Sequence, residues 1–115
     1  MARILLVEDH DLVHRYLCDA ILAAGHQAAC VKTKDEAERE LASGNFDLVV
    51  CDVRLPDGSG HDLAVEAVNL GIKAVVITGH PETAHDLASA GIAHLSKPFR
   101  IIAFMKLLEE SLSKP

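Results

Sequence analysis

The stretch LVVCDVRLPDG, residues 48–58, is an apolar run that ends at a carboxylate and continues into proline and glycine turn signals. A run of this length is typical of a strand that is buried on both faces, and such strands present functional groups at their carboxyl ends. We therefore take Asp52 as the reactive centre of the chain. Other apolar runs also stop at polar residues, namely Glu8, Asp9, Thr78 and Lys97.

Strand-like and helix-like patterns alternate along the chain. Five strands are predicted from apolar runs at residues 3–7, 27–31, 48–52, 74–77 and 92–95. The segments between and after these runs have helical spacing, and Thr33 to Glu36 matches a capping box. Because parallel strands need crossover helices, the pattern indicates an α/β fold in which a single five-stranded parallel sheet carries five helices on both faces. The fourth helix, near residues 81–90, is rich in alanine and polar residues and should pack lightly.

Length and charge limit the classes of protein. The 115 residues fit one domain, residues 1–115. The net charge of −6, with scattered Lys and Arg, argues against direct nucleic-acid binding, so DNA binding would have to come from a partner or another domain. No apolar run approaches the roughly 18 residues that span a bilayer, and Glu8 and Asp9 interrupt the first run too early for a secretory signal. We expect a soluble, cytoplasmic protein without membrane association and, because Met1 directly precedes the first strand, a natural amino terminus.

The cysteines and histidines suggest no metal site. Cys18, Cys30 and Cys51 are odd in number and lie within apolar patterns, so we expect reduced core thiols and neither a disulfide nor a zinc site. The seven histidines lack the spacing of metal ligands, and we interpret most of them as surface or loop residues.

The polar residues at the strand ends suit phosphoryl chemistry. Glu8, Asp9 and Asp52 would repel one another in a cleft, and a hard cation with oxygen ligands, such as Mg²⁺, would relieve this repulsion. A carboxylate is a competent nucleophile toward a phosphoryl group once that repulsion is neutralised, which suits Asp52. Lys97 and the Thr78 hydroxyl could then stabilise the transferring group electrostatically.

Four motifs, in this order along the whole chain, resemble the receiver domain of bacterial two-component response regulators, with a chemotaxis-regulator-like character. They are ILLVED at residues 4–9, VCDVRLPDGSG at 50–60, VITG at 76–79 and LSKPF at 95–99. The resemblance implies a flavodoxin-like receiver fold with the strand order 2-1-3-4-5. It also implies a phosphoacceptor switch that catalyses its own phosphorylation and dephosphorylation, rather than an enzyme that acts on a separate substrate.

By this resemblance, Asp52 would accept a phosphoryl group from a phosphohistidine on a sensor histidine kinase or a histidine phosphotransfer protein. Asp9 and Asp52 would ligate Mg²⁺ directly, Glu8 would do so through water, and the backbone carbonyl of Arg54 would be the remaining protein ligand. Thr78 would move toward the phosphoryl group as the switch hydroxyl.

The resemblance also implies that Lys97 contacts the phosphoryl group and that the Lys97–Pro98 bond is cis, which is uncommon for X–Pro bonds in folded proteins. His94 stands where the family usually has an aromatic switch residue; it is smaller than that residue and can be charged, or it is only a solvated strand histidine. Arg54 and His80 flank the expected entry of attacking water and should influence the lifetime of the aspartyl phosphate.

Phosphorylation would add roughly −1.5 to −2 charge and shift a two-state equilibrium of nearby segments. The lightly packed helix near 81–90, the strand at 92–95 with His94, and the last helix would form the output face, through which a homodimer could also assemble. Ile102 and Phe104 on the last helix either belong to this face or complete the core.

Two other classes compete with this interpretation. An aspartate-nucleophile phosphatase also uses a strand-end Asp and Mg²⁺, but that family has a D-x-D motif. In this chain Arg54 occupies the position of the second acid. A flavin- or nucleotide-binding module would need a small-residue phosphate loop after the first strand, where this chain has the acidic run Glu8 to Asp11. A degenerate receiver is disfavoured because every expected site residue is present.

Overall fold

The computed structural model describes residues 1–79 and 84–113, and their central feature is one five-stranded parallel sheet. Its strands are β1 (Arg3–Val7), β2 (Gln27–Val31), β3 (Leu48–Asp52), β6 (Lys73–Thr78) and β7 (Ala93–Ser96). Their order is β2-β1-β3-β6-β7. Two short strands, β4 (Arg54–Leu55) and β5 (Gly58–Ser59), form a separate antiparallel hairpin. Because β4 and β5 lie outside this sheet, β6 and β7 are its fourth and fifth strands along the chain. The strand order 2-1-3-4-5 and the fold class expected from the sequence are therefore confirmed.

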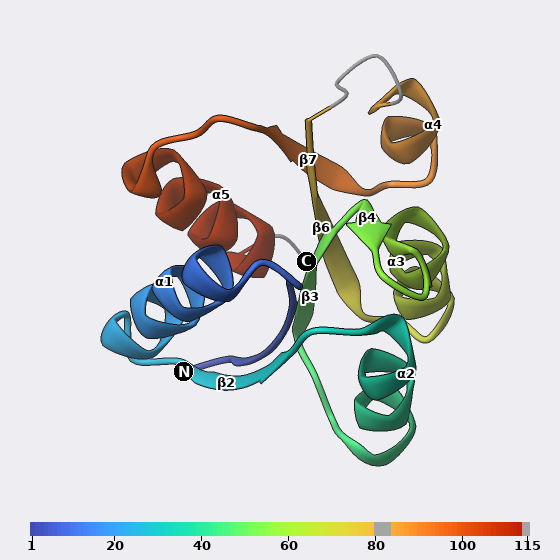
Figure 1. The fold of residues 1–115 in the computed structure, drawn as a ribbon, viewed down its shortest axis with the longest axis horizontal. Coiled ribbons are helices and arrows are strands. Elements are labelled where there is room, and N and C mark those ends of the chain that lie inside the picture. Colours follow the sequence, from blue (N-terminus) through green and yellow to red (C-terminus); the bar gives the residue numbers. More distant parts are fainter. Residues whose placement is uncertain (80–83, 114–115) are drawn as a thin grey trace.

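Helices cover both faces of the sheet (Figure 1). They are α1 (Asp11–Ala23), α2 (Lys34–Ser43), α3 (Gly60–Asn69), α4 (Ala84–Ser89) and α5 (Ile101–Ser113). In Figure 1, α1 and α5 lie on one side of the sheet, and α2, α3 and α4 lie on the other. The first part of the helix expected near residues 81–90 falls outside the described residues, and α4 is described from Ala84. None of the described helices is long and apolar enough to span a bilayer.

The central strand is buried on both faces, as its uninterrupted apolar sequence predicts. All five residues of β3 are buried, and alternate side chains enter the two cores. Val49 and Cys51 belong to the core on the side of α2, α3 and α4, whereas Leu48 and Val50 belong to the core beneath α1 and α5. The strand therefore gains burial on two sides, which fixes the position of the residue at its carboxyl end.

The last helix resolves the alternative left open for its two extra apolar residues. Phe104 is buried and its ring stacks on Phe99 with a centroid distance of 6.0 Å, so this residue completes the core. Ile102 has 76% of its surface exposed, so this residue does not complete the core. Helical spacing alone could not separate the two, because the apolar arc of α5 is wider than the face that packs on the sheet.

The prediction of three reduced cysteines is wrong. The structure joins Cys18 of α1 to Cys30 of β2 by a disulfide, with the two Cα atoms 6.3 Å apart. Both side chains pack at the edge of the core beneath α1 and α5, because α1 lies directly over β2. Cys51 is the buried free thiol, and burial, followed by the charge of Asp52, raises its pKa to about 12.

The expected capping box begins α2. The Thr33 hydroxyl oxygen accepts a hydrogen bond from the Glu36 backbone N–H at 3.1 Å and donates to the Glu36 carboxylate at 3.0 Å. The Glu36 carboxylate accepts a hydrogen bond from the backbone N–H of Lys32, one residue before the position that the usual motif reaches.

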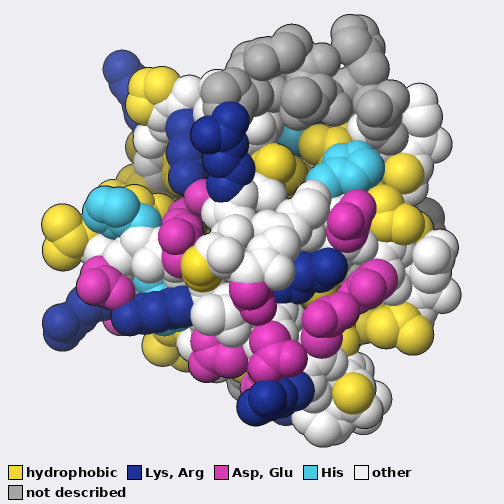
Figure 2. All heavy atoms as spheres, turned by 45° about the vertical axis from the view of Figure 1, so that its right-hand side comes forward, with side chains coloured by type: hydrophobic (Ala, Val, Ile, Leu, Met, Phe, Trp, Pro, Cys, Tyr) yellow, Lys and Arg dark blue, Asp and Glu magenta, His cyan; other side chains and the backbone are white. Residues whose placement is uncertain are grey.

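Acidic side chains gather on the face drawn in Figure 2, with Lys and Arg distributed among them, in line with the charge pattern of the sequence.

Candidate functional site

The carboxyl ends of four strands meet at one edge of the sheet, and this brings the predicted polar residues together. Asp52 is the last residue of β3 and Thr78 the last of β6, while Glu8 directly follows β1 and Lys97 directly follows β7. The backbone N–H of Lys97 donates to the carbonyl of Thr78 at 2.8 Å, which ties the end of β7 to the end of β6. Because the strands are parallel, residues that stand at their carboxyl ends lie close together in space although they are far apart in the sequence.

An open cleft of about 550 Å³ lies at this edge. Its lining includes six predicted site residues: Glu8, Asp9, Asp52, Arg54, Thr78 and Lys97. His10 also lines the cleft, and the sequence interpretation missed it. Its position directly after the acidic pair is the signal that could have identified it.

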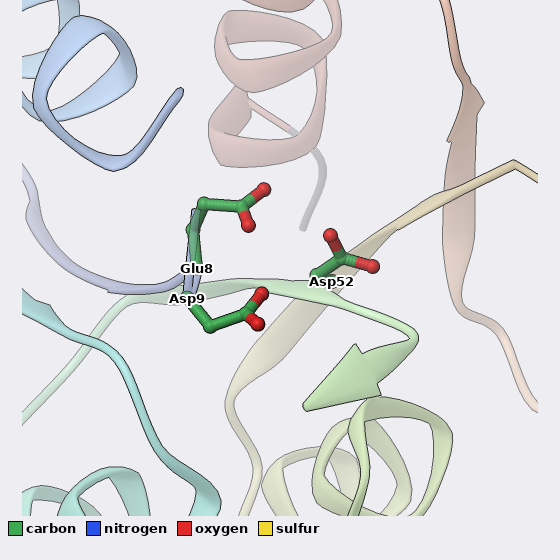
Figure 3. A group of neighbouring side chains, drawn as sticks. All are labelled: Glu8, Asp9 and Asp52. Atoms are coloured by element: carbon green, nitrogen blue, oxygen red, sulfur yellow. The ribbon is translucent and has the colours of Figure 1, made fainter. Parts of the chain in front are cut away.

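Three carboxylates converge in the cleft (Figure 3). Glu8 and Asp9 extend from the end of β1 toward Asp52 at the end of β3. One carboxylate oxygen of each residue lies within 4.8 Å of the others. Glu8 and Asp52 are buried, whereas Asp9 is exposed at the mouth of the cleft. Groups at this spacing can share one cation, since oxygen ligands of Mg²⁺ each lie about 2 Å from the ion.

Glu8 is the most deeply buried of the three, with 1% of its surface exposed. Its Oε2 atom accepts the backbone N–H of His10 at 3.1 Å, but its Oε1 atom has no hydrogen-bond partner among the described residues. Burial, and then the charge of Asp52, raise the pKa of Glu8 against the opposing effects of the His10 N–H and Lys97. A buried carboxylate oxygen without a donor fits a site that takes a cation.

Lys97 supplies positive charge to this group. Its Nζ atom lies 2.5 Å from Oδ2 of Asp52 and 3.7 Å from Oε1 of Glu8. Burial would lower the pKa of Lys97, but the hydrogen bond and charge of Asp52, together with the charges of Glu8 and Asp9, raise it overall. The ammonium therefore stays charged, and it faces more carboxylate charge than it can balance.

The loop after β3 fixes the other oxygen of Asp52. The backbone N–H of Arg54 donates to Asp52 Oδ1 at 3.2 Å, while the Arg54 side chain is exposed. Further along, the Gly60 N–H donates to the Val53 carbonyl at 2.8 Å. A Cβ atom on Gly60 would lie only 1.7 Å from the Asp52 carbonyl oxygen, so this turn requires glycine.

The predicted switch residues lie at different depths. Thr78 is fully buried and comes one residue after Ile77, the register partner of Asp52, so it lies beside the carboxylate group. His94 is exposed on the edge strand β7, opposite Val76, and does not line the cleft. His80 lies outside the described residues. The Lys97–Pro98 bond is cis, which confirms that expectation.

The arrangement as a whole suits transfer of a charged group to a carboxylate. Asp52 is held by a backbone N–H on one oxygen and an ammonium on the other, and two more carboxylates are positioned to hold a cation next to it. Arg54 stands where a D-x-D phosphatase would have its second acid, and its side chain points to solvent. The cleft therefore offers a carboxylate that could act as a nucleophile, with electrostatic partners beside it, and Arg54 occupies the position of that second acid.

Comparisons with known proteins agree with this geometry. A family model described as the response regulator receiver domain matches residues 4–109. The chain is 35% identical over 103 residues to the swarming motility regulation protein RssB of Serratia marcescens, a match that covers 85% of this chain and 47% of RssB. It is 30% identical over 117 residues to the response regulator receiver protein CpdR of Brucella abortus, covering 97% of this chain and 98% of CpdR. The chain thus spans about half of RssB but nearly all of CpdR.

Solved structures are similar over the whole chain. The non-phosphorylated receiver domain of HemR from Leptospira biflexa superposes with a TM-score of 0.92 at 32% identity, covering 100% of this chain and 97% of that one. The response regulator TrrA from Thermotoga maritima, in complex with Mg²⁺ and BeF, superposes with a TM-score of 0.85 at 26% identity, covering 96% of this chain and 98% of that one.

Proposed function

Because this chain belongs to the family of response regulator receiver domains, we propose that it carries signals in a phosphorelay by accepting a phosphoryl group on the Asp52 carboxylate. The observation that carries the proposal is the 2.5 Å contact between Lys97 Nζ and Asp52 Oδ2 beside the Glu8 and Asp9 carboxylates. In this proposal the Lys97 ammonium neutralises charge beside the Asp52 nucleophile, and the open cleft admits the phosphoryl donor. Residues 1–115 act as one receiver unit in this proposal.

The transfer step forms one bond and breaks another. An Asp52 oxygen attacks phosphorus in a phosphohistidine on a sensor histidine kinase or histidine phosphotransfer protein, the P–N bond breaks, and the imidazole leaves with the electron pair. The Lys97 ammonium and the Thr78 hydroxyl stabilise charge on the transferring oxygens. The Arg54 N–H keeps the Asp52 carboxylate oriented. Hydrolysis of the resulting acyl phosphate, with Arg54 and His80 beside the incoming water, would end the signal.

The donor set fits Mg²⁺. Glu8, Asp9, Asp52 and the Arg54 backbone carbonyl would hold the ion, with Glu8 acting through water, and the ion would supply positive charge to the phosphoryl oxygens. The buried Glu8 Oε1 atom supports this assignment, because among the described residues it has no hydrogen-bond donor, and the Lys97 ammonium lies 3.7 Å away. The Mg²⁺ and BeF in the TrrA structure are a parallel in a related protein.

Signal output would follow from the new charge on Asp52. Thr78 moves toward the phosphoryl group, Lys97 pairs with it, and the surface formed by α4, β7 and α5 changes, with His94 as the exposed switch residue. This surface would contact a partner, an output domain or a second copy of the chain. The protein would work in the cytoplasm, and its charge of −6 leaves DNA contact to other domains or partners.

Labelling with a small phosphoryl donor tests this function. With acetyl phosphate and Mg²⁺, we expect intact-mass spectrometry to find one added, acid-labile phosphoryl group, and Asp52→Asn to abolish it. Asp19→Asn is a matched control, because Asp19 is an exposed aspartate on α1, outside the cleft. Full labelling of Asp52→Asn, or labelling that does not need Mg²⁺, would refute the assignment. Turnover of many phosphoester molecules per chain would favour a phosphatase instead.

A further inference from the structure

The β4–β5 hairpin connects the phosphoacceptor strand to a distant helix. Arg54 pairs with Ser59 and Leu55 pairs with Gly58, so Asp57 lies in the turn at the hairpin tip. At the other end of the hairpin, the Arg54 N–H donates to Asp52 Oδ1. Any displacement of the hairpin would therefore move a backbone group that contacts the nucleophile.

The Asp57 carboxylate holds this tip against the first turn of α2. Its Oδ1 atom accepts the backbone N–H of Lys34 at 2.7 Å, and its Oδ2 atom accepts that of Asp35 at 2.9 Å. These two N–H groups begin the helix and have no intrahelical acceptor. The two bonds also lower the pKa of Asp57, so the carboxylate stays charged at the positive end of the helix dipole.

Side-chain packing reinforces the connection. The Lys34 side chain lies so close over Gly58 that a Cβ atom there would be 2.7 Å from Lys34 Cδ. The helix that receives the tip is itself fixed, because Ala37 and Leu41 of α2 are buried in the core. The hairpin is thus attached at both ends, to β3 at Arg54 and to α2 at Asp57.

We propose that Asp57 is a positioning residue for phosphoryl transfer, holding the hairpin on α2 so that the Arg54 backbone stays in place at Asp52. This inference rests on the proposed function. It differs from the simpler view that Asp57 only stabilises α2, which would predict loss of stability without a change at Asp52. Nothing in the resemblance to receivers or in the comparisons assigns this role to Asp57.

Thr33 provides a matched control. It caps the same helix through the Glu36 N–H but makes no described hydrogen bond to the hairpin. Thr33→Ala and Asp57→Ala should therefore both weaken the start of α2, and only Asp57→Ala should release the hairpin. Asp57→Asn keeps one carbonyl acceptor and should show an intermediate effect.

Amide hydrogen exchange on the metal-free, unphosphorylated chain tests the positioning directly. We expect Asp57→Ala to speed exchange of the Arg54 and Gly60 amides roughly tenfold, because two hydrogen bonds that close the hairpin on α2 are lost. Thr33→Ala should leave these amides unchanged. Equal acceleration in both variants, or none in Asp57→Ala, would overturn the proposal.

Phosphorylation kinetics provide the second readout. In acetyl phosphate labelling, Asp57→Ala should raise the half-saturating Mg²⁺ concentration roughly tenfold, as loss of groups that support metal ligands does elsewhere. Thr33→Ala should keep the wild-type value, and Asp57→Asn should lie between the two. An unchanged Mg²⁺ requirement in Asp57→Ala would overturn the proposal. Continued labelling of Asp52→Asn would instead show that the proposed function fails, while the exchange result would still report on the hairpin.

Discussion

The Nζ atom of Lys97 lies 2.5 Å from Oδ2 of Asp52, although 45 residues separate them in the sequence. The contact forms because β3 and β7 flank β6 and their carboxyl ends reach the same edge of the sheet. The Glu8 and Asp9 carboxylates lie close to that of Asp52, so the Lys97 ammonium balances part of the negative charge of these three residues. Both the reactivity of Asp52 and the stability of the cleft should depend on it.

Replacing Lys97 by Met should slow labelling by acetyl phosphate on the order of a hundredfold, because a preorganised positive group at the transferring oxygens is lost. The free energy of unfolding without Mg²⁺ should fall by about 1 kcal/mol, a small value because the Lys97 side chain is 35% exposed and partly screened. Labelling time courses and urea unfolding measure the two effects. Lys106→Met, at an exposed position on α5, should change neither, and equal behaviour of the two variants would refute the role of Lys97.

Gly60→Ala should destabilise the chain by about 2 to 3 kcal/mol, because its Cβ atom would meet the Asp52 carbonyl oxygen at 1.7 Å and backbone must move. Urea unfolding measures the loss. Gly79→Ala is the control for stability, since a Cβ atom there would have none of the described residues within 4 Å. If the two substitutions lower the free energy of unfolding equally, the close approach of Gly60 to β3 does not exclude a larger residue at position 60.

The metal-free chain should lose stability as the pH rises above the ordinary pKa of a glutamate. Burial raises the pKa of Glu8, so between the ordinary and the raised value the folded chain keeps a proton that the unfolded chain has released. Deprotonation then favours the unfolded state, by about 1.4 kcal/mol for each unit of pKa difference.

Glu8→Gln isolates this effect, because its amide does not titrate. The stability of the variant relative to wild type, from urea unfolding with a chelator, should increase with pH across that window and then level off. Added Mg²⁺ should stabilise wild type more than the variant, because an ion that binds the folded chain shifts the folding equilibrium and the variant lacks the Glu8 carboxylate. A difference that is independent of pH would contradict the raised pKa of Glu8.

Reduction should lower the free energy of unfolding by about 2 to 3 kcal/mol, because the Cys18–Cys30 disulfide closes a short loop in the unfolded chain. Urea unfolding with and without a reductant measures this loss, and the stability of a Cys18→Ser, Cys30→Ser double variant should not depend on the reductant.

In the reduced native chain, an alkylating reagent should react with the partly buried thiols of Cys18 and Cys30. It should not react with Cys51, which is fully buried and has a pKa of about 12. Rapid alkylation of Cys51 in the folded chain would contradict its position in the core.

Most of the fold follows from local patterns. The uninterrupted apolar run of residues 48–52 requires burial on two faces, and crossover helices require parallel strands. These two constraints place the carboxyl ends of the strands at one edge of the sheet, and Glu8, Asp52, Thr78 and Lys97 line one cleft at that edge. The hairpin at Arg54 was not predicted, since two strands of two residues each have no periodicity to detect.

The sequence by itself determined the parallel sheet and the polar residues at its edge, because the period of apolar residues and the ends of apolar runs are local properties. The order of the strands was implied by the resemblance of the four motifs to receiver domains. Only the tertiary structure decided that Cys18 joins Cys30, that Phe104 is buried while Ile102 is exposed, and that the Asp57 carboxylate accepts hydrogen bonds from the first turn of α2. Each of these depends on which helix packs on which strand and at what rotation. Side-chain contacts between distant segments are set by that packing, and periodicity specifies only that a face is buried.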